Sequence, residues 1–266
     1  MKSFEIFDEE LGISIGILLY YERSSEFIIE LQENLDEWTA PLLLTSFVKN
    51  GTFTIPRDIS FLWVKERVIP SGRQNIGAIL ETHKLKHYDE MKFLEISKGK
   101  CSQDNMFIDG IPYLPEYVIE RQMKNLLDVS ILDTHMLLCF FADGTVKKVD
   151  LAKLIDQDGV EKVIRNEVLY QSGKIGVGGY AVTFNDSIDI PAWRLYEAGE
   201  RIPLSMQDFK KFIKNNVLST GESCELLECS RQNIAYMVKK EQLEPLKSHE
   251  KGNLYLRGDV EKIRWQ

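Results

Sequence analysis

The chain of 266 residues has few cysteines, no long apolar run and no excess of positive charge. Its four cysteines show no Cys-x-x-Cys spacing, which argues against a zinc ribbon or a disulfide-stapled scaffold. The longest apolar runs, 42–44 and 136–142, fall short of the ~18–20 residues that cross a bilayer. The first residues turn acidic at once and lack the apolar stretch of a signal peptide. We therefore expect a cytoplasmic protein with no membrane partner.

Charge is unevenly distributed along the chain. The net charge of −8 by itself argues against a nucleic-acid partner. Residues 229–266 nevertheless hold eight Lys/Arg against five Asp/Glu, a net of +3, so the rest of the chain carries −11. A basic tail on an acidic body is typical of a protein in which one small module contacts phosphate.

Hydrophobic periodicity predicts a multi-domain α+β protein of three parts. They are an N-terminal mixed α/β region at 1–128, whose role the sequence does not indicate, a small β-hairpin-rich α+β module at 129–200, and a C-terminal winged helix-turn-helix with a leading helix at 201–266. Period-2 alternation at 13–19, followed by a polar turn and an apolar run at 27–31, predicts a β-hairpin.

Capping residues and prolines predict several helices in the first part. Asp36 is expected to cap a helix at 37–49, and Pro56 to open a second at 57–68. A third helix is expected at 74–83.

The second part contains an Asp-Gly turn between two apolar segments. Strands are expected at 137–141 and 146–149 around this turn, and Asp150 is expected to cap a short helix at 151–155. The glycine-rich stretch 173–179 is expected to be a loop. A later strand at 180–184, a helix at 192–197 and a Ser205-capped helix ending near 216 complete the prediction.

Two segments of the second part resemble a family of small bacterial α+β domains whose function is uncharacterised. They are FFADGTVKKVDL at 140–151 and FNDSIDIPAWRLYE at 184–197. The family usually has Asn-Gly where this chain has Asp186-Ser187, so that turn is expected to differ. The resemblance implies a fold and not a reaction.

The residues from Ser219 onward carry the main functional pattern. A helix is expected at 221–227, followed by a short turn and a second helix that Ser230 caps. In that second helix, Ile234 and Met237-Val238 have the spacing of a buried stripe. The opposite face carries long polar side chains, namely Arg231, Gln232, Asn233, Tyr236, Lys239 and Lys240.

This division of faces is what reading of double-stranded DNA requires. Arg pairs with guanine edges, and Asn or Gln pairs with adenine edges, from the start of a recognition helix. Lysines later on the helix are better placed for phosphates, which position the protein without specifying sequence. A β-wing is expected from a strand at 243–249 and a return strand at 254–257, with Lys247, Lys251 and Arg257 as further DNA contacts.

The segment resembles the MerR/excisionase-like winged helix-turn-helix superfamily. The resemblance lies in Ser230-Arg231-Gln232, in Lys239-Lys240 and in Asp259, which is expected to cap a closing helix at 260–265. Glu228 and Glu241 replace glycines common in that superfamily. We expect both turns to form without a positive φ, and the two acids to weaken DNA binding.

The resemblance implies a bacterial transcriptional regulator or accessory DNA-binding factor that contacts double-stranded DNA as a homodimer, since one domain covers a half-site. The alternative is a protein-interaction module, such as an antitoxin-like protein that docks a protein partner through the same helices. A hydrolase with a site dispersed over the N-terminal region is a third interpretation.

No metal site, cofactor site or catalytic set is predicted. His83 and His87 have a spacing that can chelate zinc, but no third ligand lies near them in sequence. The glycines of 173–179 lack the Gly-Lys-Ser/Thr ending of a phosphate-binding loop. The abundant acids are explained by turns and helix caps, and no nucleophile with a base and an orienting group is visible.

Overall fold

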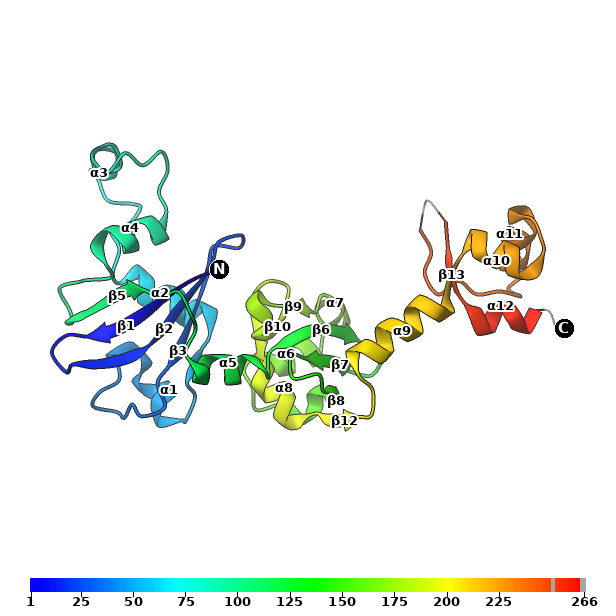
Figure 1. The fold of residues 1–266 in the computed structure, drawn as a ribbon, viewed down its shortest axis with the longest axis horizontal. Coiled ribbons are helices and arrows are strands. Elements are labelled where there is room, and N and C mark those ends of the chain that lie inside the picture. The colour runs from blue at the N-terminus through cyan, green and yellow to red at the C-terminus, as the bar shows by residue number, and fades with distance from the viewer. Residues whose placement is uncertain (250–251, 264–266) are drawn as a thin grey trace. The chain divides into compact units, whose positions relative to one another are not determined.

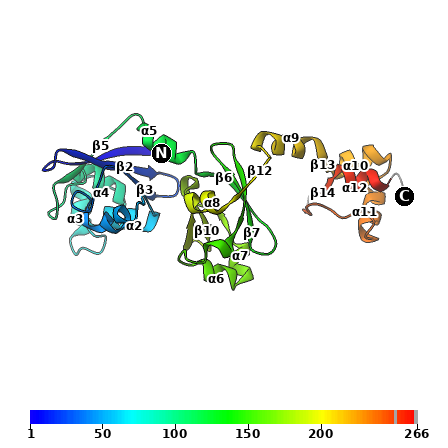
Figure 2. The same cartoon turned by 90° about the horizontal axis from the view of Figure 1, so that it is seen from below.

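A computed structural model describes residues 1–249 and 252–263. The chain forms two compact units: unit 1 contains Met1–Asp143 and Lys148–Gly199, and unit 2 contains Gly144–Lys147 and Glu200–Gln266. Short helices alternate with several small sheets in the chain (Figures 1 and 2), which confirms the predicted α+β class.

Unit 1 begins with an antiparallel sheet of five strands in the order β4-β3-β2-β1-β5. The predicted hairpin is confirmed: β2 and β3 pair in a register that places Leu19 opposite Ile28. Strand β5 pairs with β1 at one edge, and β4 pairs with β3 at the other. The strand bounds are Lys2–Asp8 (β1), Ile13–Tyr21 (β2), Glu26–Leu31 (β3), Thr54–Ile55 (β4) and Met106–Gly110 (β5).

Both faces of this sheet are covered, so its central strands are apolar on both sides. Leu18 and Ile29 belong to a core cluster that also contains Trp63 of α2 and Leu94 of α4. Ile17, Leu19 and Ile28 instead pack with Val118 of α5 and with Tyr180. The helix bounds are Arg57–Lys65 (α2), Ile76–Thr82 (α3), Glu90–Ser97 (α4) and Glu116–Gln122 (α5).

The helix expected at 37–49 is wrong in its first half. Asp36 closes a turn in which its carboxylate accepts hydrogen bonds from the backbone N–H groups of Trp38 and Thr39, both at 2.9 Å. A 3-10 helix follows at Leu42–Leu44, and α1 spans only Thr45–Lys49. Pro41 explains the break, since it disfavours α geometry in the preceding residue and has no N–H to donate. The helices expected after Pro56 and near 74–83 are present as α2 and α3.

Residues 126–198 form a small module of hairpins and short helices that belongs to unit 1 except for Gly144–Lys147. The strands on either side of the Asp-Gly turn are present, with Gly144 at φ +84° in the turn. The Asp150 carboxylate accepts from the Ala152 N–H and caps a 3-10 helix at Leu151–Leu154, as expected. The strands are β6 (Leu126–Ile131), β7 (Met136–Phe141), β8 (Val146–Asp150), β9 (Lys174–Ile175), β10 (Ala181–Phe184) and β11 (Ile188–Pro191), and the helices are α6 (Val160–Ile164), α7 (Glu167–Gln171) and α8 (Ala192–Ala198).

The glycine-rich stretch is more ordered than the expected loop, because β9 and a 3-10 turn at Val177–Gly179 lie within it. Gly179 has φ +74°, and a Cβ there would lie 2.2 Å from the Leu126 carbonyl oxygen. A side chain at this position is therefore excluded both by backbone conformation and by packing. This close approach fixes the residue that precedes Tyr180.

Unit 2 is built around a core of Leu218, Ile234, Leu243, Tyr255 and Val260. Strands β13 and β14 pair antiparallel, with Leu218 opposite Tyr255. The elements are β12 (Glu200–Ile202), α9 (Met206–Asn216), β13 (Val217–Ser219), α10 (Thr220–Leu227), α11 (Arg231–Lys239), β14 (Leu254–Leu256) and α12 (Arg257–Ile263). The Ser205 cap of α9 is confirmed by its hydroxyl, which accepts from the Asp208 N–H.

Two expectations about the end of the chain are wrong. The segment 243–249 is not a strand and keeps a single β-bridge, between Lys247 and Leu254. The other edge of β14 pairs with β13 over three residues, and Tyr255 of β14 belongs to the core of unit 2. Asp259 lies in the first turn of α12 and not at its N-cap, since the helix already begins at Arg257. Trp265 lies outside the described residues.

Candidate functional site

Helices α10 and α11 are held at both N-termini by side-chain caps. The Ser219 hydroxyl accepts from the Glu222 N–H, and the Glu222 carboxylate accepts from the Ser219 N–H at 2.7 Å, which is a capping box. This hydrogen bond, the Ser219 hydroxyl and the charge of Arg257 lower the pKa of Glu222. The predicted Ser230 cap is confirmed, because its hydroxyl accepts from the Asn233 N–H at 3.3 Å. Both helices therefore begin at fixed residues, and a short turn at 228–230 joins the end of α10 to the start of α11.

Helix α11 has one buried and one exposed face. Ile234 is fully buried, and Met237 and Val238 pack against the same core, as their spacing predicts. The residues expected on the polar face are all exposed, namely Ser230, Arg231, Gln232, Asn233, Tyr236, Lys239 and Lys240.

The first polar side chains of α11 are free to contact a partner. Within residues 1–249 and 252–263, the side chains of Arg231, Gln232 and Asn233 make no hydrogen bond or ion pair with the rest of the chain. The Tyr236 ring is 56% exposed, and the Lys240 Nζ lies 5.8 Å from its centroid. The start of the helix thus presents unpaired donors and acceptors, followed by an aromatic ring and two lysines.

Both glutamates that replace common glycines adopt the left-handed conformation. Glu228, the C-cap of α10, has φ +51°, and Glu241 has φ +57°. The expectation of turns without positive φ is therefore wrong. Each glutamate occupies the left-handed position that commonly ends a helix, where glycine is usual but other residues also occur. A non-glycine residue there costs about 1–2 kcal/mol.

The other expected DNA contacts have different surroundings. Lys247 is exposed beside the single bridge to Leu254, and Arg257 is exposed at the start of α12. Lys251 lies outside the described residues. The Thr220 hydroxyl donates to the Asn253 carbonyl and accepts from the Asn253 N–H, both at 3.2 Å, which ties the chain before β14 to the start of α10.

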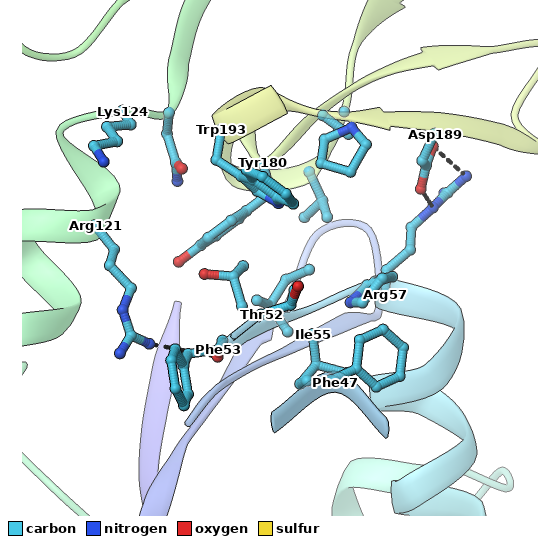
Figure 3. Close-up of a pocket in the computed structure, with 18 of the residues that line it drawn as sticks. Phe47, Thr52, Phe53, Ile55, Arg57, Arg121, Lys124, Tyr180, Asp189 and Trp193 are labelled. Carbon is cyan, nitrogen blue, oxygen red and sulfur yellow. Dashed lines mark hydrogen bonds and ion pairs between the residues drawn. The ribbon is translucent and has the colours of Figure 1, made fainter. Parts of the chain in front are cut away.

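Unit 1 contains a pocket that the sequence did not predict. It has a volume of about 470 Å³ and is lined by the segment 47–57, the end of α5 and residues of the hairpin module. Figure 3 shows Tyr180 and Trp193 on one side, and Phe47 and Phe53 on the other. Two aromatic residues from each side of the pocket thus converge on one cavity.

Two arginines of the pocket wall are held by carboxylates. Arg57 donates from Nε to Asp189 at 2.7 Å and also forms an ion pair with Glu26 (Figure 3 shows the Asp189 pair). Arg121 donates from one Nη to Glu30 at 3.0 Å and from the other to Glu33 at 3.1 Å. These pairs fix both guanidinium groups and leave little net charge on them.

A buried carboxyl group lies behind this wall. Glu30 is fully buried, and its Oε2 accepts from the Thr54 hydroxyl at 2.8 Å and from Arg121. Burial raises the pKa of Glu30, although Thr54 and Arg121 act in the opposite direction. Burial likewise raises the pKa of Tyr21 to about 12, with the charge of Glu30 adding to it. The phenol of Tyr180 accepts from the Gln122 side chain at 2.9 Å.

The polar face of α11 was visible in the sequence because one helix carries all of it. The pocket was not, because its lining comes from segments more than a hundred residues apart. No local pattern relates Phe53 to Trp193. The apolar-aromatic content of 47–57 was the only signal, and it is equally typical of a core.

In the part of the chain that the structure describes, no helix is both long and apolar enough to cross a membrane. Among the same residues, no group of three or more His, Cys, Asp or Glu side chains is arranged to hold a metal ion. Comparison with protein-family models, with curated proteins and with solved structures finds no match to this chain.

Proposed function

We propose that unit 2 contains a winged helix-turn-helix that binds double-stranded DNA, with α11 as the helix that enters the major groove. The observation that carries the proposal is the exposed polar face of α11, fixed by the Ser230 cap and by buried Ile234. Side chains that read bases must be free of internal partners and must project from a rigid element. Among the residues that the structure describes, Arg231, Gln232 and Asn233 meet both conditions.

The order of residues along α11 supports separate roles. Arg231, Gln232 and Asn233 occupy the first turn, from which recognition helices contact base edges. Lys239 and Lys240 follow two turns later, where an ammonium group is suited to phosphate. Together with Lys247 and Arg257, they supply the positive charge of the proposed DNA contact. The remainder of the chain is acidic and does not add to the attraction of DNA. Binding of a regulator of this kind would involve two copies on two half-sites.

A mobility-shift titration of the full chain with random duplex DNA, at low and at physiological salt, tests the proposal. The affinity should fall with salt at a slope of about −0.9 per phosphate contacted. Replacing Lys239 and Lys240 with alanine should therefore reduce the slope by up to ~1.8. Asn233→Ala should mainly relax sequence preference, at ~1–3 kcal/mol of discrimination for a bidentate pair.

The matched control is the double change of Lys210 and Lys211 to alanine. These neighbouring lysines are exposed on α9 in the same unit, so the change in net charge is identical. An equal loss of slope in both double variants would mean that bulk charge, and not the α11 face, holds the DNA. Absence of binding at low salt would reject DNA as the partner and favour docking of a protein through the same helices.

A further inference from the structure

The pocket of unit 1 is lined by aromatic side chains from two segments of the chain. Tyr180 and Trp193 belong to the hairpin module, and Phe47 and Phe53 belong to the segment that precedes α2 (Figure 3). Trp193 is only partly buried, so its ring retains a free surface in the absence of a ligand. Aromatic side chains on two sides of a cavity favour a flat ring system over a branched or flexible aliphatic ligand, because a flat ring can stack on an aromatic face. The volume of about 470 Å³ lies within the range of small-molecule sites.

The pocket lining holds three acids, Glu33, Asp189 and Glu197, and three basic residues, Arg57, Arg121 and Lys124, so that its formal charges balance. Arg57 is compensated by Glu26 and Asp189, and Arg121 by Glu30 and Glu33. A ligand with a large charge would have to compete with these pairs. The wall is suited instead to a ring that is neutral and polar at its edge.

Three hydrogen-bonding side chains of the pocket lining have no partner among the described residues. Asn50, Thr52 and Gln157 line the pocket, and in the described residues their side chains make no hydrogen bond. A carboxamide offers one acceptor and two donors in a plane, which matches the edge of a heteroaromatic base. Two such amides and a hydroxyl can therefore satisfy a ring edge that carries both donors and acceptors.

We infer that the unit 1 pocket binds a nucleobase, stacked between Trp193 and the phenylalanine side and hydrogen-bonded through Asn50 and Gln157. Aromatic stacking and amide pairing are the two means by which proteins hold unpaired bases. The base can belong to a free nucleoside or nucleotide, or to an unpaired position of a single strand. This inference does not depend on the proposed function of unit 2.

One cation of the pocket is available for a phosphate. Lys124 lines the pocket, and within the described residues it forms no ion pair; its Nζ lies 5.7 Å from the Tyr196 ring. Arg57 and Arg121 are already paired, so Lys124 is the cation of the lining that is left to attract a phosphate, against the opposing charge of Glu197. We expect a nucleoside monophosphate to bind more tightly than its nucleoside.

Calorimetric titration of the full chain with the four ribonucleosides, adenosine monophosphate and a short single-stranded DNA tests the inference. Saturable binding of one of these probes is expected. Trp193→Leu should weaken it roughly 5- to 150-fold, the range that corresponds to loss of one base stack. Trp38→Leu is the matched control, because Trp38 is 84% exposed and lies outside the pocket. Gln157→Ala gives a second variant at a surface position.

The variants also separate the source of the base and the two proposals. Lys124→Met should remove the preference for adenosine monophosphate, whereas Lys162→Met, an exposed lysine of α6, should not. The strand is also tested in a chain in which Lys239 and Lys240 are replaced by alanine. If the single-stranded DNA is the only probe that binds, and Trp193→Leu abolishes its binding to this chain, the base belongs to a strand. If no probe binds, or if Trp193→Leu and Trp38→Leu have equal effects, the inference is wrong, whatever the DNA affinity of unit 2.

Discussion

Glu228 is the residue at which stability and DNA affinity can be separated by two substitutions. It ends α10 at φ +51° and ψ +41°, a left-handed conformation that glycine adopts without steric cost. Glu228→Gly removes both the backbone strain and the negative charge. Glu228→Gln removes the charge alone and keeps the strain. The two variants should therefore share their effect on DNA binding and differ in their effect on folding.

The size of the folding effect follows from two opposing terms. Release of the left-handed strain is worth about 1–2 kcal/mol. Glycine also gives the unfolded chain more freedom, which takes back about 0.4–1 kcal/mol. We expect a net stabilisation of unit 2 of about 0.5–1 kcal/mol for Glu228→Gly and no comparable gain for Glu228→Gln.

Hydrogen exchange of backbone amides measures this effect locally. The amide of Ile234 belongs to α11 and to the core of unit 2, so its exchange reports opening of that core. A gain of 0.5–1 kcal/mol should slow the exchange by about two- to fivefold. Equal exchange rates in the glycine and glutamine variants would refute the conformational reasoning. Equal DNA affinities in all three proteins would refute the view that this acid opposes binding.

Three further predictions concern unit 1. Gly179→Ala should cost about 1–3 kcal/mol more than Gly12→Ala in urea unfolding, because both have positive φ but only the first would place its Cβ 2.2 Å from a backbone oxygen. Burial raises the pKa of Glu30 above its ordinary 4.5, so stability should fall as pH rises from 4.5 through the folded-state pKa. Glu30→Gln should flatten that fall, and an unchanged pH profile would reject the cause given. Burial raises the pKa of Cys139 to about 12, so iodoacetamide should label partly exposed Cys101 in the native protein and reach Cys139 only after unfolding.

Much of the local structure was predictable because it depends on neighbours in sequence. The Ser230 cap, the strands on either side of the Asp-Gly turn and the α11 stripe all follow from side chains within four residues of one another. The helix expected from Asp36 failed where a proline outweighed periodicity. The expected wing strand is reduced to the Lys247–Leu254 bridge on one edge of β14, and Pro245 in that segment has no N–H to donate to a ladder. The other edge of β14 pairs with β13, where Leu218 lies opposite Tyr255, 37 residues later. Strand pairing at that separation leaves no mark in a local pattern.

The candidate sites also differ in whether neighbouring residues are sufficient to predict them. Arg231, Gln232 and Asn233 were found because exposure on a helix follows directly from period 3.6. The conformation of Glu228 was not, since the glycine that normally signals a left-handed turn is missing. Trp193 was not predicted as a site residue, because nothing in the neighbouring sequence shows that it lines the same pocket as Phe53.

Salt dependence separates the two proposed binding modes within one chain. Contacts of Lys239 and Lys240 with duplex phosphates release counterions, so that affinity must fall steeply as salt increases. Stacking of a neutral nucleoside on Trp193 releases none, and its affinity should change little over the same range. A nucleotide that also contacts Lys124 should lie between these limits, with a slope of about one charge. If nucleoside binding instead fell as steeply as duplex binding, both would have to involve the same basic surface, and the pocket would lose its role.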